Sequence, residues 1–220
     1  MMKNKNIRVP EKTETFNLEN FHELCDHLAN QDADLKLILE NHGYPPMWTR
    51  ANTFESLVHI ILEQQVSLAS ALAALNKLKE KLTEIVPENI LKLSDEEMRE
   101  CYVSRQKNAY IKGLANAIVK GEIDLEKLSK MSNDEARETL VSLKGIGNWT
   151  VDVYLMFTLQ RTDIFPIGDL AAVNAAKRLK QLPKTTAKEE ILKISEKWKP
   201  FRSIASMMLW HYYLSNLKTK

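Results

Sequence analysis

The chain has 220 residues, 44% of them hydrophobic, and a formal net charge of +2. This length predicts one compact domain or two small lobes that share a core. No apolar run is long enough to span a bilayer, and no secretory apolar region follows the N-terminal residues 1–5. We therefore expect an intracellular protein with no membrane partner.

The cysteine content limits which metal sites and disulfides are possible, and the charge distribution shows where a phosphate could bind. Two isolated cysteines, Cys25 and Cys101, cannot supply a disulfide framework, a zinc-binding pattern or a four-cysteine iron–sulfur cluster. Residues 177–220 hold 11 of the 31 Lys and Arg residues but only 3 of the 29 Asp and Glu residues. This basic segment fits either a phosphate-facing surface or an ordinary solvated helical face.

Helical patterns follow one another along the whole chain. Residues 1–16 are polar and predict an arm. Apolar positions at helical spacing and other helix-compatible runs then predict helices over residues 18–29, 34–41, 54–62, 68–82, 95–103, 108–119, 133–142, 151–159, 170–180, 187–197 and 201–217. The sequence shows no strand alternation of any length, so we expect an all-α fold with short connections.

Several helix starts carry a capping-box pattern. In this pattern a polar side chain at the helix start and an acidic side chain three residues later each bond the other residue's backbone N–H. The candidate pairs are Asn52 with Glu55, Ser94 with Glu97, Ser132 with Glu135, and Thr186 with Glu189. Each pair predicts a helix that begins directly after its first member.

Residues 143–169 join a glycine turn to a helix that we expect to be buried on all sides. Gly145 and Gly147 lie two positions apart and allow a tight turn with exposed backbone. Apolar side chains then occur on nearly every side of the helix 151–159. A turn with bare amides at the start of a helix is suited to binding a phosphate. A segment rich in Gly and Pro follows and ends at Asp169.

Two pieces of this segment resemble a known superfamily. Residues 143–150 (LKGIGNWT) resemble the hairpin of the helix-hairpin-helix DNA glycosylases, the HhH-GPD superfamily. Residues 165–169 (FPIGD) resemble the catalytic segment of that superfamily. The resemblance covers roughly residues 30–215 and is greatest to the 3-methyladenine DNA glycosylase II type, without the extra N-terminal domain of some bacterial members.

The resemblance implies an architecture of two helical lobes with a cleft between them. One lobe would combine residues 1–50 with residues 166–220. The other lobe would hold residues 51–165 and carry the helix-hairpin-helix motif at about 133–160.

Asp169 is the candidate catalytic residue. A glycosylase flips its target nucleotide out of the duplex and then breaks a bond to an anomeric carbon through an oxocarbenium-like transition state. A carboxylate near that carbon stabilises the positive charge and can activate the attacking water. Asp169 also precedes an apolar helical run and is predicted to be an ordinary helix N-cap, and both roles are compatible.

Trp149 and Trp210 are the candidate substrate-binding residues. Bifunctional relatives carry a lysine at the position of Trp149, and an indole cannot form their Schiff base, so the resemblance implies a monofunctional enzyme without lyase activity. Tryptophans at the positions matching Trp149 and Trp210 line the pocket of the alkylpurine branch. An electron-rich indole attracts a flat cationic base such as an N-alkylated purine. The alternative for both tryptophans is packing in the core.

The remaining candidates concern DNA contacts. We expect Gly145 and Gly147 to present N–H groups, and Thr150 a hydroxyl, to a backbone phosphate. Residues 61–67 (ILEQQVS) resemble the segment from which these enzymes push a wedge into the duplex. By that match Gln65 is the candidate wedge, and its alternative is an exposed polar helix end.

By the same resemblance a structural Na⁺ or K⁺ would be held near the hairpin and would bridge to the phosphate. Its ligands would be the backbone carbonyls of Val141, Leu143 and Ile146. We expect no other cofactor and no iron–sulfur cluster.

The predicted function is that of a monomeric hydrolase that removes 3-methyladenine and 7-methylguanine from double-stranded DNA. It would act in the nucleoid-associated cytoplasm, or in the nucleus of a eukaryote. Two alternatives remain: a glycosylase for another damaged or mismatched base, and a non-catalytic helix-hairpin-helix module that only binds DNA. The non-catalytic module would need neither the carboxylate of Asp169 nor the pair of tryptophans.

Overall fold

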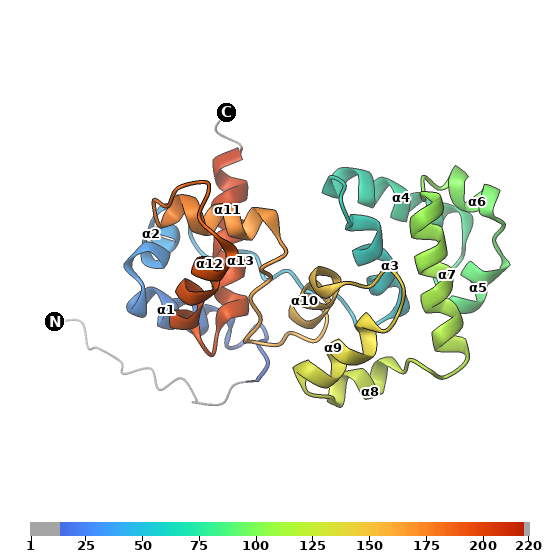
Figure 1. The fold of residues 1–220 in the computed structure, drawn as a ribbon, viewed down its shortest axis with the longest axis horizontal. Helices are drawn as coiled ribbons and strands as arrows, with labels where there is room; N and C mark the ends of the chain where they lie inside the picture. Colours follow the sequence, from blue (N-terminus) through green and yellow to red (C-terminus); the bar gives the residue numbers. More distant parts are fainter. Residues whose placement is uncertain (1–13, 218–220) are drawn as a thin grey trace. The chain divides into compact units, whose positions relative to one another are not determined.

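The computed structural model describes residues 14–217, and Figure 1 shows that these residues fold into helices. Outside the helices, the described part of the chain contains one isolated β-bridge, between Thr15 and Arg161. The predicted all-α class is therefore confirmed. Contacts divide the chain into two units: the N-terminal residues through Thr49 together with Gln160 onward (unit 1), and Arg50–Leu159 (unit 2). The boundaries differ slightly from the lobes expected from the sequence: residues 160–165 belong to unit 1, and Arg50 belongs to unit 2.

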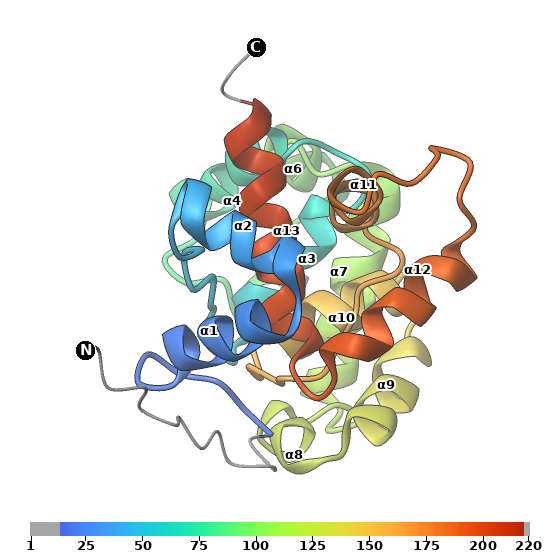
Figure 2. The ribbon, with the colours of Figure 1, turned by 90° about the vertical axis from the view of Figure 1, so that its left-hand side faces the viewer.

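Unit 1 is built around its last helix. Its elements are α1 (Phe21–Gln31), α2 (Ala33–His42), α11 (Leu170–Leu179), α12 (Lys188–Ser195), the 3₁₀ helix η1 (Glu196–Trp198) and α13 (Arg202–Leu217). Helix α13 packs against α1, α2 and α11 (Figure 2). Its residues 203–210 are all buried, so this helix forms the centre of the unit. Close packing on all sides makes it a rigid support for the side chains that project from it.

Unit 2 contains the predicted helix-hairpin-helix. Its elements are α3 (Phe54–Glu63), α4 (Leu68–Lys81), α5 (Pro87–Lys92), α6 (Asp95–Glu100), α7 (Arg105–Val119), α8 (Leu125–Lys130), α9 (Asn133–Val141) and α10 (Asn148–Phe157). Helix α3 contacts α4, α7 and α10, and α9 packs against α10 (Figure 1). Residues 150–156 of α10 are all buried, as the all-round apolar pattern predicted.

Two short helices, α5 and α8, were not predicted from the sequence. Helices α5 and α8 have six residues each, too few for a helical apolar period to stand out. Pro87 occupies the first turn of α5, where the missing N–H of proline removes no helical bond.

The four capping-box predictions had different outcomes. Full capping boxes at Ser94 and Ser132 are confirmed. The Asn52 prediction is wrong: Thr53 caps α3 by accepting from Ser56 N, and the Asn52 amide instead bonds Leu125 O (2.8 Å) and Tyr154 Oη (2.7 Å).

The Thr186 prediction is also wrong. Helix α12 begins after Ala187, and no side chain caps it.

The structure describes only the last three residues of the predicted N-terminal arm, residues 14–16. Residues 1–13 of the predicted arm lie outside the described residues. Phe16 is 1% exposed, and its N–H donates to Gln160 O at 2.9 Å. This pairing fastens the start of the described chain to the segment that enters unit 1 after α10.

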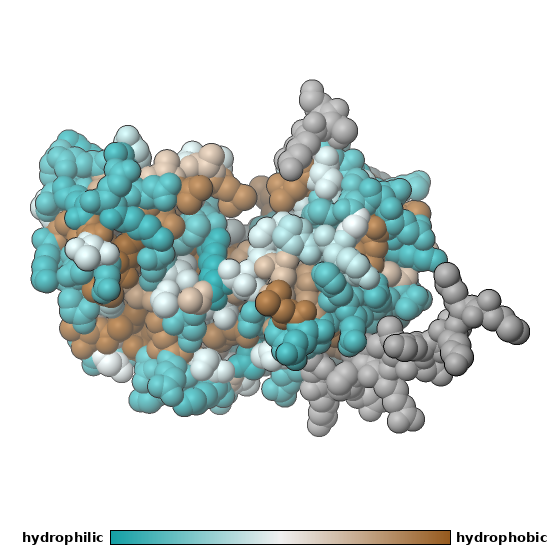
Figure 3. Space-filling model, turned by 180° about the vertical axis from the view of Figure 1, so that it is seen from behind, coloured by the Kyte–Doolittle hydropathy of each residue, from teal (hydrophilic) through white to brown (hydrophobic). Residues whose placement is uncertain are grey.

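The surface mixes hydrophilic and apolar residues (Figure 3), as is usual for a folded chain. Among the helices of residues 14–217, none is both long and apolar enough to cross a membrane.

A cluster around Asp32 ties three parts of unit 1 together. Asp32 caps α2 and accepts bonds from Lys180 Nζ (2.7 Å) and from Trp198 Nε1 (2.8 Å). Burial opposes the charged carboxylate, but the hydrogen bonds from Lys180 and Trp198 outweigh it and hold the pKa of Asp32 below its usual range. The ionised carboxylate is therefore the form that stabilises this fold.

We expect Asp32→Asn to lower the free energy of unfolding by about 2 kcal/mol at neutral pH, because Lys180 loses its main charged partner. A depressed pKa in the folded state contributes stability above the unfolded pKa of about 4, and this contribution is lost as the pH falls through the folded value. The difference from wild type in denaturant melts should thus be constant above about pH 5 and shrink below about pH 4.

The control is Glu40→Gln in the same α2, because Glu40 forms an exposed pair with Lys36 at 3.7 Å that contributes little. Equal losses in the two variants, or an Asp32→Asn loss that grows as the pH falls, would contradict the account.

Candidate active site

Asp169 is held by two N–H donors. It is the N-cap of α11, and its Oδ1 accepts from Ala172 N at 2.8 Å. The same oxygen accepts from Trp210 Nε1 at 2.9 Å. The predicted capping role is thereby confirmed. Two donors from different helices fix the plane of a carboxylate that is half-buried.

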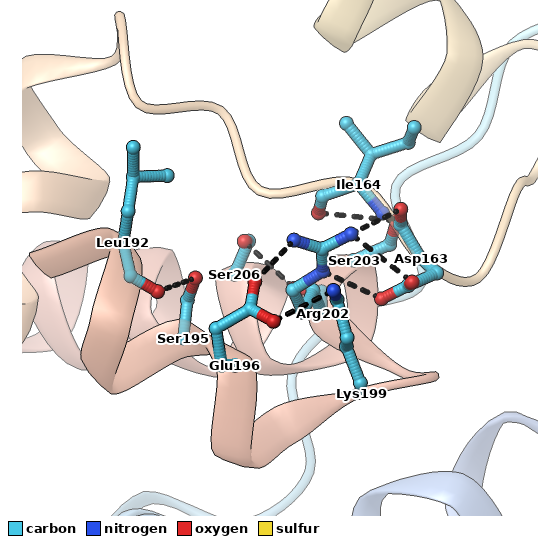
Figure 4. Close-up of polar contacts among 9 residues, drawn as sticks. All are labelled: Asp163, Ile164, Leu192, Ser195, Glu196, Lys199, Arg202, Ser203 and Ser206. Carbon is cyan, nitrogen blue, oxygen red and sulfur yellow. Dashed lines mark hydrogen bonds and ion pairs between the residues drawn. The ribbon is translucent and has the colours of Figure 1, made fainter. Parts of the chain in front are cut away.

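The segment that leads to Asp169 is fastened to the start of α13 (Figure 4). Arg202 bonds the Asp163 carboxylate with two nitrogens, Nε to Oδ1 at 2.7 Å and Nη2 to Oδ2 at 3.1 Å. Ser203 Oγ accepts from Ile164 N at 3.0 Å, and Ser203 N donates to Thr162 O at 2.9 Å. Helix α13 thus positions both the approach to Asp169 and, through Trp210, the carboxylate itself.

The other partner of Arg202 is Glu196, whose Oε1 lies 3.3 Å from Nη1 (Figure 4). Glu196 also pairs with Lys199 at 2.6 Å. A charged network therefore surrounds the first turn of α13 and neutralises part of the basic C-terminal segment.

Trp210 and Trp149 occupy different surroundings. Trp210 is 9% exposed on α13, so it satisfies the core-packing expectation while its indole N–H serves Asp169. Trp149 lies in the first turn of α10 in unit 2 and is half-buried. The structure brings Asp169 and Trp210 together within unit 1, and it places the hairpin residues and Gln65 in unit 2.

The hairpin turn between α9 and α10 depends on Gly145. This residue has φ +90°, in the left-handed region, and a Cβ there would overlap the ring of Tyr110. Glycine is therefore required twice, by the backbone and by the packed ring.

Gly147 is different. It is exposed, has φ −99° and would accommodate a Cβ without contact. Gly147 is the N-cap of α10 and has no side chain that could accept hydrogen bonds from the N–H groups of the first turn. Those N–H groups can therefore bind another acceptor, such as an anion.

Thr150 corrects one sequence-based prediction. Its side chain is 1% exposed, and Oγ1 accepts from Gln64 Nε2 at 2.9 Å. The hydroxyl therefore stabilises the interior of unit 2 and is not presented to a phosphate. Gln64, which the sequence analysis did not single out, also donates to Gly145 O at 2.9 Å.

A buried ion pair fixes the angle between the arms of the hairpin. Arg137 on α9 bonds Asp152 and Asn148 on α10. Asp152 is 5% exposed, and burial raises the pKa of its carboxyl, while Arg137 acts in the opposite direction. The pair therefore links α9 to α10 and restrains the turn between them.

The cation site that the sequence predicts at the hairpin would be built from backbone carbonyls. Leu143 O accepts from Ile146 N at 3.1 Å, and a carbonyl oxygen retains a second lone pair for a ligand. Among the described residues, no group of three or more His, Cys, Asp and Glu side chains could hold a metal. The backbone carbonyl oxygens of Val141, Leu143 and Ile146 are neutral, and neutral carbonyl oxygen is one of the ligand types that hard cations accept.

Gln65 follows α3 in a left-handed conformation, with φ +56°, and its side chain is exposed. The expectation of a polar helix end that projects outward is therefore confirmed.

Comparison with known proteins places this geometry in a family. The profile of the HhH-GPD superfamily base excision DNA repair protein matches residues 58–200. DNA-3-methyladenine glycosylase 1 of Schizosaccharomyces pombe is 35% identical over 191 residues, which cover 84% of this chain and 84% of that protein.

Solved structures agree. The S. pombe 3-methyladenine DNA glycosylase in complex with abasic DNA has a TM-score of 0.80 at 34% identity, covering 86% of this chain and 95% of that chain. The DNA-3-methyladenine glycosidase of Bacillus halodurans has a TM-score of 0.74 at 28% identity, covering 89% and 91%. With a matched profile, a relative and two structures in agreement, this chain belongs to the HhH-GPD superfamily of base excision DNA repair proteins.

Proposed function

We propose that this protein is a monofunctional DNA glycosylase that flips N-alkylated purines, such as 3-methyladenine and 7-methylguanine, out of duplex DNA and hydrolyses their glycosidic bond. The observation that carries the proposal is the Asp169 carboxylate, fixed by Ala172 N and Trp210 Nε1. The 3-methyladenine glycosylases to which the chain is similar support the choice of substrate.

Asp169 acts on the sugar. As the base departs, positive charge develops on the anomeric carbon and the ring oxygen. A carboxylate whose orientation is fixed beforehand stabilises that charge without reorganising, and it can take a proton from the attacking water. The two donors on Oδ1 supply this orientation.

Trp149 and Trp210 serve the base. An indole face attracts a cationic purine by roughly 0.5–2 kcal/mol, and the positive charge of that purine makes it a good leaving group. Trp149 stands where a Schiff-base lysine would be needed, so water is the nucleophile and an abasic site is the product.

The hairpin serves the DNA backbone. N–H groups at Gly145 and Gly147 bind a phosphate, and the carbonyls of Val141, Leu143 and Ile146 hold a structural Na⁺ or K⁺ beside it. Gln65 is the wedge that enters the duplex. The partner is double-stranded DNA, bound by a monomer in the nucleoid-associated cytoplasm, or in the nucleus if the source is eukaryotic.

We expect Asp169→Asn to leave the fold and the DNA affinity intact, because asparagine caps a helix about as well and its Oδ1 still accepts from Ala172 and Trp210. Base release should fall on the order of 10²-fold, since the negative charge and the general base are both lost. The measurement is single-turnover release of 3-methyladenine from duplex DNA.

The matched control is Asp124→Asn, because Asp124 caps α8 in the same way through the N–H groups of Glu126 and Lys127. Near-normal release by Asp169→Asn would show that Asp169 is only a cap.

We expect Trp210→Phe to slow base release by about tenfold, because phenylalanine keeps an aromatic side chain there but cannot donate the Nε1 hydrogen bond that orients Asp169. Trp198→Phe is the matched control: Trp198 is fully buried in the same unit and also donates its Nε1 to an aspartate, Asp32. That control should lose thermal stability but keep its rate of release. Equal rates in the two variants, well below their unfolding temperatures, would contradict the positioning role of Trp210.

A further inference from the structure

The loop after α3 is tied to the hairpin by one amide. Gln64 Nε2 donates to Gly145 O and to Thr150 Oγ1, both at 2.9 Å. A backbone carbonyl can only accept a hydrogen bond, so the amide nitrogen must be the atom that faces Gly145. Both N–H groups of the amide are therefore used, and they join loops that lie 81 residues apart in the chain.

The loop itself has a conformation that needs support. The residue next to Gln64 is Gln65, whose φ of +56° is adopted by a side-chain-bearing residue only where its surroundings hold it. Lys107 Nζ donates to Leu62 O at 2.7 Å and secures the end of α3 just before the loop. The exposed Gln65 side chain therefore projects from a backbone that is held directly before it, at Leu62 and at Gln64.

The hairpin turn is gripped from a second direction. The ring of Tyr110 fills the space where a side chain at Gly145 would lie, and Gln106 Nε2 bonds Tyr110 Oη at 2.6 Å. Gly145 is thus held between an aromatic ring and the Gln64 amide. Loosening the amide leaves the turn attached to α7 but detaches it from the loop of Gln65.

We propose that Gln64 is a positioning residue that sets the wedge Gln65 at a fixed distance from the phosphate-binding hairpin. This inference rests on the proposed function. A wedge displaces a base only if the DNA backbone is anchored at a matching distance, and small displacements of such geometry lower rates strongly. Gln64 thereby couples anchoring of the backbone to extrusion of the base, without contacting either the lesion or the phosphate.

The test compares two substrates that differ in the work of extrusion. Duplexes carry 7-methylguanine opposite cytosine or opposite a mismatched adenine, because an unpaired base is easier to flip. With Gln64→Met, release from the paired duplex should fall about tenfold, and release from the mismatched duplex should change much less. Gln64→Glu, which keeps the size but loses the donor, should show the same dependence on pairing and serves if the methionine variant does not fold.

Asn52→Ala is the matched control. Asn52 is another amide of unit 2 with two distant partners, Leu125 O and Tyr154 Oη, and it lies outside the loops proposed to face DNA. Its loss should lower stability but leave the wild-type ratio of the two substrates.

Equal losses on both duplexes for Gln64→Met and Gln64→Glu, or the same ratio change in Asn52→Ala, would overturn the positioning role alone. Absence of release by the wild-type protein would instead overturn the proposed function, and the inference with it.

Discussion

The hydrogen bond from Trp210 Nε1 to Asp169 is the interaction on which the proposed chemistry depends. It joins the carboxylate at the start of α11 to the buried central helix of unit 1. The same helix holds the approach segment through Arg202 and Ser203. Because residues 203–210 of α13 are all buried, Trp210 anchors the carboxylate to the core of unit 1, and mobility of a surface loop does not set its orientation.

In unit 2, packed side chains likewise fix the position of backbone groups, those of the hairpin turn. Gly145 turns the chain because no side chain hinders it, Tyr110 fills the space that this leaves, and Gln64 ties the turn to the neighbouring loop. The Arg137–Asp152 pair sets the two arms. A turn that is fixed before DNA arrives loses little entropy on binding a phosphate, which favours a preorganised grip.

The sequence predicted the features whose causes are local. The capping boxes at Ser94 and Ser132 each lie within four consecutive residues, and the cap at Asp169 directly precedes its helix. Two predictions failed because a distant partner competes for the same side chain. Asn52 bonds Leu125 and Tyr154 in place of the helix start, and the Thr150 hydroxyl accepts from Gln64, 86 residues earlier in the chain, in place of facing outward. No local pattern reveals such partners, because they depend on how the helices pack.

Incubation of the wild-type protein with duplex DNA that carries 3-methyladenine or 7-methylguanine, followed by analysis of both the base and the strand, tests the proposed hydrolysis most directly. We expect free alkylated base, an intact strand with an abasic site, and no covalent adduct trapped by borohydride, since Trp149 cannot form a Schiff base. Failure to release either base while undamaged DNA is bound would point to a non-catalytic DNA-binding module. A trapped adduct would contradict hydrolysis by water and require a nucleophilic lysine elsewhere in the chain.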